Sequence, residues 1–171
     1  MEFQNVPAIV TGGASGLGEG AARALAAAGC KVAILDVNKE QGEKVAAELG
    51  GIFLHCDVTS ADSAEAAVSA AREAHGPCGV AVNCAGIAPA AKILGREGVM
   101  PLESFSKVVQ VNLIGTFNIL RLAAADMAQR EPNGDGERGV IINTASVAAY
   151  EGQIGQAAYS ASKGGVVSLP L

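Results

Sequence analysis

The fold of this chain is decided by one stretch near its N-terminus, Ala8-Ile9-Val10-Thr11-Gly12-Gly13-Ala14-Ser15-Gly16-Leu17-Gly18. Its first three residues predict a short buried strand, and the alanine-rich segment from Leu17 onward predicts a helix. A strand that turns into a helix over glycines leaves backbone N–H groups free at the helix start, where the helix dipole attracts negative charge. The stretch therefore predicts either an ordinary glycine-rich turn or a cradle for the pyrophosphate of a dinucleotide.

Composition narrows the class of protein. The 171 residues suffice for one domain with a sizeable core, and half of them are apolar while only 4% are aromatic. A core of Ala, Val, Leu and Ile is typical of a parallel sheet covered by helices. The net charge of −5, without a basic cluster, argues against nucleic acid as a partner.

Neither a signal peptide nor a metal site is expected. The N-terminus lacks the charged-then-apolar layout of a leader, and we expect no apolar run long enough to cross a bilayer. The four cysteines form no C-x-x-C pair and only two histidines are present, which favours free thiols without zinc. These features predict a cytoplasmic or organelle-matrix protein without a membrane partner.

Apolar runs alternate with helical segments along the whole chain. Such alternation predicts a single α/β domain over residues 1–171 with a parallel sheet. The expected strands are residues 8–10, 31–35, 52–56, 79–82 and 140–144. The expected helices are residues 17–28, 38–49, 60–75 and 101–129, with a further helix opening at Tyr159. Residues 87–100 and 131–138 are expected to form surface loops.

An acidic residue follows the second predicted strand. Asp36 lies 18 residues beyond Gly18, close to the offset of the acid that binds the adenosine ribose in dinucleotide folds. A carboxylate there accepts hydrogen bonds from ribose hydroxyls and repels a 2′-phosphate, which favours NAD over NADP. Lys39 nearby is weak counter-evidence, and the alternative role for Asp36 is to cap the next helix.

A serine, a tyrosine and a lysine are spaced for proton transfer. Ser146 directly follows the fifth strand, and Tyr159 and Lys163 are four residues apart. On a helix such a pair shares one face, with Cβ atoms about 5–6 Å apart. A free tyrosine has a pKa near 10, and a positive charge beside a tyrosine favours the phenolate form. The pair predicts an acid–base site with Ser146 holding the substrate oxygen, unless it is a solvated pair on a helix surface.

These motifs together resemble those of the short-chain dehydrogenase/reductase family, and the resemblance covers the whole chain. They are Thr11-Gly12-x-x-x-Gly16-x-Gly18, Asn83-Cys84-Ala85-Gly86, and Ser146 with Tyr159 and Lys163. The resemblance implies a Rossmann-type doubly wound sheet of strand order 3-2-1-4-5 and NAD-dependent hydride transfer between a secondary alcohol and a ketone. The implied cofactor-binding residues are Gly12, Ser15, Gly16, Leu17, Gly18, Asp36, Asp57, Val58, Asn83, Ala85, Gly86, Tyr159 and Lys163.

Further roles follow from the same resemblance. The implied catalytic residues are Ser146, Tyr159, Lys163 and Asn112, the last as a proton-relay member; its alternative role is to bend the helix. Asp57 brackets the adenine ring in the family, although it could instead cap the following helix. Asn83 is expected to tie neighbouring strands through its side chain. Cys84 departs from the family, which has asparagine at that place.

A finer resemblance points to one branch of the family. The run from Gly139 to Gln153, with the polar residues 130–138, resembles type 2 3-hydroxyacyl-CoA dehydrogenases, also described as 17β-hydroxysteroid dehydrogenases type 10. This implies reversible oxidation of a 3-hydroxyacyl-CoA, with Ser146 and Gln153 near the substrate. It also implies a homo-oligomer, a tetramer or dimer, that uses the helix at 101–129 and the helix that opens at Tyr159. The alternatives are an NAD-binding module without turnover and an enzyme acting on steroid or other alcohols.

Family members continue well past Lys163. They add a sixth and a seventh strand and a substrate-covering segment, none of which is present in the 171 residues. We therefore expect the fifth strand to have an open edge, which invites association. We also expect a chain of this length to be poorly stable and to lack most of the substrate pocket.

Overall fold

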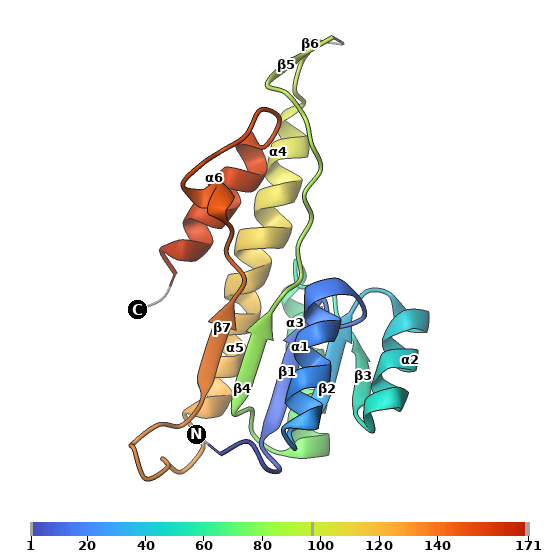
Figure 1. Cartoon of the computed structure of the whole chain (residues 1–171), viewed down its shortest axis with the longest axis vertical. Helices are drawn as coiled ribbons and strands as arrows, with labels where there is room; N and C mark the ends of the chain where they lie inside the picture. The colour runs from blue at the N-terminus through green and yellow to red at the C-terminus, as the bar shows by residue number, and fades with distance from the viewer. Residues whose placement is uncertain (1, 97, 170–171) are drawn as a thin grey trace.

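Five parallel strands form the centre of the molecule, which the computed structural model describes over residues 2–96 and 98–169. They are β1 (Pro7–Thr11), β2 (Lys31–Asp36), β3 (Ile52–His55), β4 (Val80–Asn83) and β7 (Val140–Asn143). Their order across the sheet is β3-β2-β1-β4-β7, and every pair is parallel (Figure 1). The predicted order 3-2-1-4-5 is confirmed, because β7 is the fifth strand of that prediction.

Helices cover both faces of this sheet. α1 (Gly16–Ala27) and α2 (Lys39–Leu49) pack on one face, and α3 (Ala61–His75) and α5 (Gly115–Met127) pack on the other. Successive residues of a strand point to opposite faces, so Ile9 joins the cluster under α3 and α5 while Val10 joins the cluster under α1 and α2. α4 (Leu102–Val109) and α6 (Ala157–Val167) pack on each other beyond the carboxyl ends of the strands (Figure 1). The architecture is that of a Rossmann-type α/β fold.

The N-terminal caps of α2 and α3 are not the aspartates Asp36 and Asp57 that were considered as caps above. The side chains of Asn38 and Ser60 accept hydrogen bonds from the backbone N–H three residues further on, at the starts of α2 and α3. A capping role for Asp36 or Asp57 is therefore wrong. Asp36 lies two residues before its cap and bonds Ala14 N and Asn38 N, and Asp57 lies three residues before its cap and bonds Thr59.

The predicted helix at 101–129 is not a continuous α-helix. A π-helical segment, Gln110–Ile114, lies between α4 and α5. Such a segment widens one turn by a residue and is found mostly at functional sites. By length and composition alone, the helix from Leu102 to Met127 could cross a membrane, and within the described residues it is the one helix that could. The expectation that no apolar run is long enough is therefore wrong, although 39% of this helix's most apolar window is buried inside the molecule.

The predicted loop at 87–100 contains a short hairpin. β5 (Leu94–Gly95) and β6 (Gly98–Val99) pair in the antiparallel sense and project from the molecule near α4 (Figure 1). Both strands are fully exposed, so no alternation of buried and exposed residues marks them in the sequence. The segment is exposed, as expected of a surface loop, and the hairpin is local structure that the sequence did not predict.

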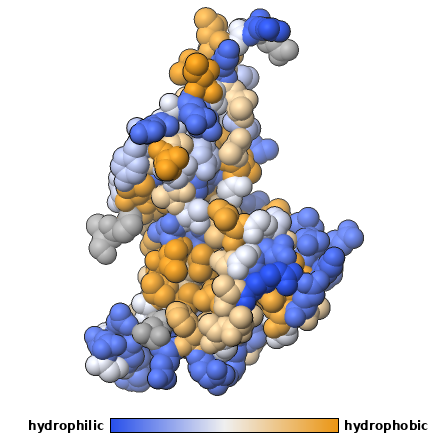
Figure 2. Space-filling model, viewed as in Figure 1, coloured by the Kyte–Doolittle hydropathy of each residue, from blue (hydrophilic) through white to orange (hydrophobic). Residues whose placement is uncertain are grey.

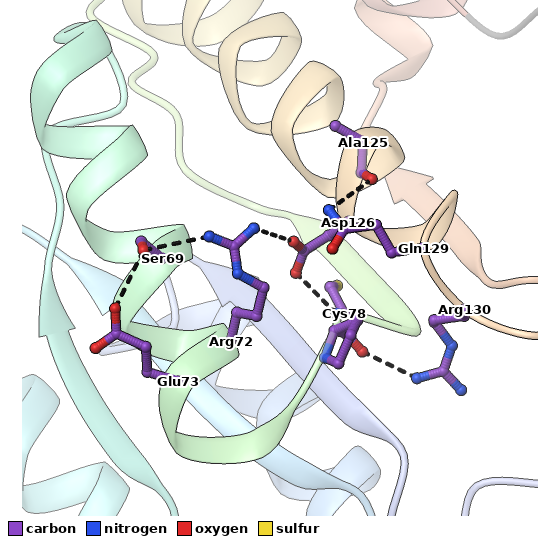
Figure 3. A network of polar contacts seen from close by, with 9 residues as sticks. Ser69, Arg72, Glu73, Cys78, Ala125, Asp126, Gln129 and Arg130 are labelled. Atoms are coloured by element: carbon purple, nitrogen blue, oxygen red, sulfur yellow. Dashed lines mark hydrogen bonds and ion pairs between the residues drawn. The ribbon is translucent and has the colours of Figure 1, made fainter.

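A buried carboxylate fixes the segment that leads into β4 (Figure 3). Asp126 of α5, 2% exposed, accepts a hydrogen bond from Cys78 N at 2.9 Å and pairs with Arg72 of α3 at 2.9 Å. Arg130 donates to the carbonyl of Pro77 at 2.9 Å. These contacts join α3, α5 and the segment that leads into β4.

Apolar side chains gather over the face formed by β4 and β7, as Figure 2 shows. Val140 and Ile142 of β7 are exposed there. Within residues 2–96 and 98–169, β7 is paired with β4 on one side and its other edge is open. The predicted open edge of the fifth strand is thus present in the described part of the chain.

Candidate active site

Polar side chains tie the carboxyl ends of three strands together. Asn83 on β4 donates from Nδ2 to Oδ1 of Asn143 on β7 at 2.9 Å, and the hydroxyl of Thr11 on β1 donates to Asn83 Oδ1 at 3.4 Å. The same hydroxyl accepts from the backbone N–H groups of Cys84 and Ala85, each at 3.2 Å. The predicted strand-tying role of Asn83 is confirmed, and Thr11 extends it into the turn that follows β4.

Two glycines of the N-terminal loop are required by close backbone packing. Gly12 lies in the left-handed region with φ of 63°, and a Cβ there would come within 2.8 Å of Ala85 N. A Cβ on Gly18 would lie 2.1 Å from the carbonyl oxygen of Gly12. The loop therefore folds onto itself and onto the turn after β4, which brings these two predicted cofactor segments together.

The start of α1 faces open space. Gly16 is its first residue, with φ of 56°, and a Cβ built there would meet nothing within 4 Å. Ser15 precedes it without a side-chain cap bond, and Leu17 is exposed. The first N–H groups of a helix have no intrahelical partner, so this end of α1 presents free donors and the positive end of the dipole. Ser15, Gly16 and Leu17 fit the diphosphate of a dinucleotide.

Asp36 lies against the glycine loop at the end of β2. Its Oδ2 accepts a hydrogen bond from Ala14 N at 3.1 Å, and its Oδ1 accepts one from Asn38 N at 2.9 Å. Two backbone donors thus fix the orientation of this carboxylate beside the opening of α1. That is the place from which it could meet a ribose.

Asp57 and Val58 follow β3. Asp57 Oδ1 accepts hydrogen bonds from the hydroxyl of Thr59 at 2.7 Å and from Thr59 N at 2.9 Å, and these bonds hold the pKa of Asp57 below its ordinary value. Val58 is buried, and a Cβ on Gly115 of α5 would lie 2.5 Å from its methyl group. The side chain of Val58 therefore belongs to the packing between β3 and α5.

Asn112 occupies the π-helical segment and is completely buried. Its Oδ1 accepts from Ile87 N at 2.8 Å, and its Nδ2 donates to Ile87 O at 2.9 Å and to Ser162 Oγ at 3.1 Å. Its carbonyl accepts from the hydroxyl of Thr116 at 2.7 Å. Asn112 thus lies in a locally altered helix and reaches the helix of Tyr159 through Ser162.

Tyr159 and Lys163 share one face of α6, as the spacing predicts. The Lys163 ammonium lies 5.8 Å from the centre of the Tyr159 ring and donates to the carbonyl of Thr144 just after β7. Lys163 is 6% exposed, and this burial lowers its pKa, an effect that the neighbouring Cys84 opposes. The pair is therefore a partly enclosed cation and phenol, not a solvated pair on a helix surface.

Ser146 lies on the segment that connects β7 to α6. Its Oγ accepts a hydrogen bond from Ala148 N at 3.2 Å and so begins the short 3₁₀ turn Val147–Ala149, against which α6 packs. Because the oxygen accepts from the backbone, the hydroxyl proton stays available for another acceptor. The Sγ atom of Cys84 lies 3.3 Å from the Thr144 hydroxyl on the same segment.

Gln153 lies further along the same connection and is exposed. It lines a cavity of about 480 Å³ between residues 91–94 and residues 152–160. A neighbouring cavity of about 550 Å³, lined mostly by apolar side chains, extends from residues 87–91 to α4. The predicted substrate residue therefore borders space near the helix of Tyr159. Within the described residues, no group of three or more metal-ligating side chains lies together.

Two residues at the site make contacts that the sequence did not predict, although Thr11 stands at the head of the glycine motif. Thr11 organises the turn after β4, and Ser162 connects Asn112 to the helix of Tyr159. The spacing of Ser162, three residues after Tyr159 on a helix, was the available signal. It says nothing of the partner, because Asn112 is 50 residues away in the chain.

Known proteins share this arrangement. The family model described as short chain dehydrogenase matches residues 7–170. The 3-hydroxyacyl-CoA dehydrogenase type-2 of Rattus norvegicus is 54% identical over 168 residues, and that of Homo sapiens is 51% identical over 168 residues. Each match covers 96% of this chain and 64% of the relative, so the chain spans just under two thirds of their length.

Solved structures agree with the sequence relatives. The crystal structure of 3-hydroxyacyl-CoA dehydrogenase type-2 from Mycobacterium avium superposes with a TM-score of 0.92 at 44% identity. The superposition covers 99% of this chain and 68% of that structure. On the fold, the strand-end motifs and these matches, the chain belongs to the short chain dehydrogenase family.

Proposed function

We propose that this chain binds NAD and carries the hydride-transfer site of an oxidoreductase that acts on a secondary alcohol, specifically a 3-hydroxyacyl-CoA. One observation carries the proposal: half-buried Tyr159 and buried Lys163 share one face of α6, which packs against the segment of Ser146 at the sheet edge where α1 opens. An alcohol oxidation needs a proton acceptor and a hydride acceptor at one place, and this edge offers room for both.

Asp36 supports NAD as the cofactor rather than NADP. Its carboxylate is held by Ala14 N and Asn38 N beside the free N–H groups of α1. A fixed negative charge there accepts hydrogen bonds from ribose hydroxyls and repels a 2′-phosphate. When bound, NAD supplies the acceptor for the hydride of the alcohol.

Three side chains handle the proton at the substrate oxygen. Ser146 donates its free hydroxyl proton to that oxygen and holds it near Tyr159. Tyr159 takes the proton of the alcohol during oxidation and returns it during reduction. Lys163, anchored on the Thr144 carbonyl, provides positive charge beside the phenolate.

The choice of a 3-hydroxyacyl-CoA draws on the rat and human relatives, which are named for that substrate. Gln153 and the cavity of about 480 Å³ that it lines give an acyl thioester a place beside the site. We assign Gln153 to the substrate for this reason.

Steady-state assays test substrate and cofactor together. We expect NADH formation from a short 3-hydroxyacyl-CoA, with NAD preferred over NADP by roughly tenfold or more in kcat/KM, since about 1.4 kcal/mol gives a tenfold ratio. Asp36→Asn should narrow this preference, whereas Asp62→Asn, at an exposed position of α3, should not. If the protein oxidises steroid or other alcohols but no 3-hydroxyacyl-CoA, the proposed substrate class is wrong. NAD binding without any turnover would leave a binding module.

We also propose that the chain forms a homo-oligomer through its long helix. Leu102, Ile114 and Phe117 are exposed on α4, the π-helical segment and α5. Large apolar side chains that share a helix are typical of an interface between subunits. Sedimentation of the purified chain should give a dimer or tetramer. The four free cysteines suit a reducing compartment, and we place the protein in the cytoplasm or an organelle matrix.

A further inference from the structure

The hydroxyl of Ser162 joins parts of the site that are far apart in the chain. Its Oγ donates to the carbonyl of Tyr159 at 2.7 Å and accepts from Nδ2 of Asn112 at 3.1 Å. Both Ser162 and Asn112 are 0% exposed, so water cannot replace either bond. We propose that Ser162 is a positioning residue, which fixes the turn of α6 that carries Tyr159 and Lys163. Its effect on turnover rests on the proposed function, whereas its effect on the position of Tyr159 does not.

Asn112 continues the connection to the cofactor side. Its amide holds both the N–H and the carbonyl of Ile87. Ile87 directly follows Gly86, where a Cβ would lie 3.3 Å from Asn112 Oδ1. Two side chains, those of Asn112 and Ser162, therefore span the distance from the turn after β4 to the helix of the phenol. The placement of Tyr159 relative to the cofactor turn depends on this chain of hydrogen bonds.

Within the described part of the chain, the bond between Asn112 and Ser162 is the side-chain hydrogen bond that joins the π-helical segment to α6. Along the same contact, a Cβ on Gly165 of α6 would lie 2.6 Å from the side chain of Leu113 in the π-helical segment. Small residues allow this close approach, but an apolar contact of this kind does not select one position along the helix. A hydrogen bond is directional and does select one. The Thr116 hydroxyl, bonded to Asn112 O, supports the widened turn from its other side.

Another serine on the same helix provides a matched comparison. Ser168 follows the last residue of α6 and donates to the carbonyl of Gly164 at 3.3 Å, the same kind of local bond that Ser162 makes. Ser168 is exposed, and within residues 2–96 and 98–169 its hydroxyl bonds to no residue of another segment. Local back-bonding of serine on a helix does not by itself stabilise the protein. What distinguishes Ser162 is its second, buried partner.

The experiment uses the two tyrosines of the chain as reporters. Tyrosine labelled with ¹³C at Cζ gives one signal from Tyr159 and one from Tyr150, which is 77% exposed and serves as the internal reference. Spectra of the ligand-free chain, kcat, and the KM for NAD are measured for the unmodified protein, Ser162→Ala, Ser162→Cys and Ser168→Ala. Cysteine has the shape of serine with a larger terminal atom and keeps a weaker donor and acceptor at this place, so this variant gives a second test if Ser162→Ala does not fold.

We expect Ser162→Ala to shift the Tyr159 signal and lower kcat by about tenfold or more, with the KM for NAD changed by less than about twofold, because a small misplacement of a reacting group lowers the rate steeply. Ser162→Cys should give smaller changes of the same sign, and Ser168→Ala none. A Tyr159 signal and a kcat that remain unmoved in both Ser162 variants would overturn the proposal. If the unmodified protein shows no NAD-dependent turnover but the Tyr159 signal still moves, the positioning role stands and the proposed function fails.

Discussion

The two sides of the candidate site are held in place by different kinds of groups, backbone on one side and side chains on the other. On the side of β1, α1 and β2, the chain relies on backbone groups: Gly12 and Gly18 pack against other backbone, and Gly16 opens α1 to space. On the side of β7 and α6, buried side chains do the positioning, above all Asn112 and Ser162. Both sides meet at the carboxyl edge of one parallel sheet (Figure 1).

This difference predicts opposite sensitivities. The backbone-built side should be damaged by atoms that are added, because there is no room for a Cβ at its close approaches. The side built from side chains should be damaged by polar atoms that are removed, because buried partners are then left without a hydrogen bond. The substitutions below test each side with a control on the same element or of the same kind.

The largest effect is expected at the phenol. Tyr159→Phe removes the proposed proton acceptor and should lower kcat by about a thousandfold, within the range of general acid–base catalysis, while the affinity for NAD changes little. Tyr150→Phe is the control, because that side chain is exposed. Equal rates in the two variants, measured by stopped-flow or steady-state absorbance, would rule out Tyr159 as the catalytic group.

Next in size is the glycine loop. Gly18→Ala places a methyl group 2.1 Å from a backbone oxygen and should cost about 3 kcal/mol in the free energy of unfolding, together with most of the NAD affinity. Gly20→Ala, on the same helix and with nothing within 4 Å of its Cβ, should instead stabilise by up to about 1 kcal/mol. Denaturant unfolding measures both. A mild Gly18→Ala would mean that the loop can widen, against the close packing described here.

Asp126 tests the packing of α3 and α5 against the start of β4. Asp126→Asn weakens the bonds to Arg72 and Cys78 N, and we expect a loss of about 2 kcal/mol in stability, since the carboxylate is buried while Arg72 is partly exposed. Glu65→Gln breaks an exposed pair with Arg121 and should cost less than about 1 kcal/mol. Similar costs for the two variants in urea unfolding would contradict the role given to the buried bond.

The smallest effect concerns alkaline pH. Burial raises the pKa of Cys78 to about 12, above the ordinary thiol value of 9.0. Above about pH 9 the unfolded chain therefore loses a proton that the folded chain keeps, and stability falls as the pH rises towards the folded value. Cys78→Val removes this contribution and should reduce the loss between about pH 9 and about pH 10 by roughly 1 kcal/mol. Parallel stability curves for the variant and the unmodified protein would show that Cys78 does not behave this way.

The sequence predicted the backbone-built side well because its signals are local. The glycine order from Thr11 to Gly18 and the offset to Asp36 lie within one βαβ unit, and the structure brings these residues to one place. Each strand was marked by a short apolar run, and the strand order was predicted from the resemblance to the short-chain dehydrogenase/reductase family. The pair of Tyr159 and Lys163 was also found from a local signal, because four residues on a helix define a face.

The features that the sequence did not predict have physical causes. The bond between Ser162 and Asn112 joins residues 50 apart, and no local pattern encodes it. A single π-helical turn at Gln110–Ile114 does not disturb hydrophobic periodicity enough to be noticed. Asn38 and Ser60 cap α2 and α3, because a residue directly before the first helical turn can bond the free N–H groups of that turn. Asp36 and Asp57 lie two and three residues earlier in the chain.

The central claim is direct hydride transfer from a secondary alcohol at the site of Tyr159. The most direct measurement follows the label from a 3-hydroxyacyl-CoA that carries deuterium on the carbinol carbon, with mass spectrometry of the recovered nicotinamide cofactor. We predict deuterium in the reduced cofactor with the unmodified chain and none with Tyr159→Phe over the same time. A reduced cofactor without deuterium, or equal labelling by both proteins, would contradict the account.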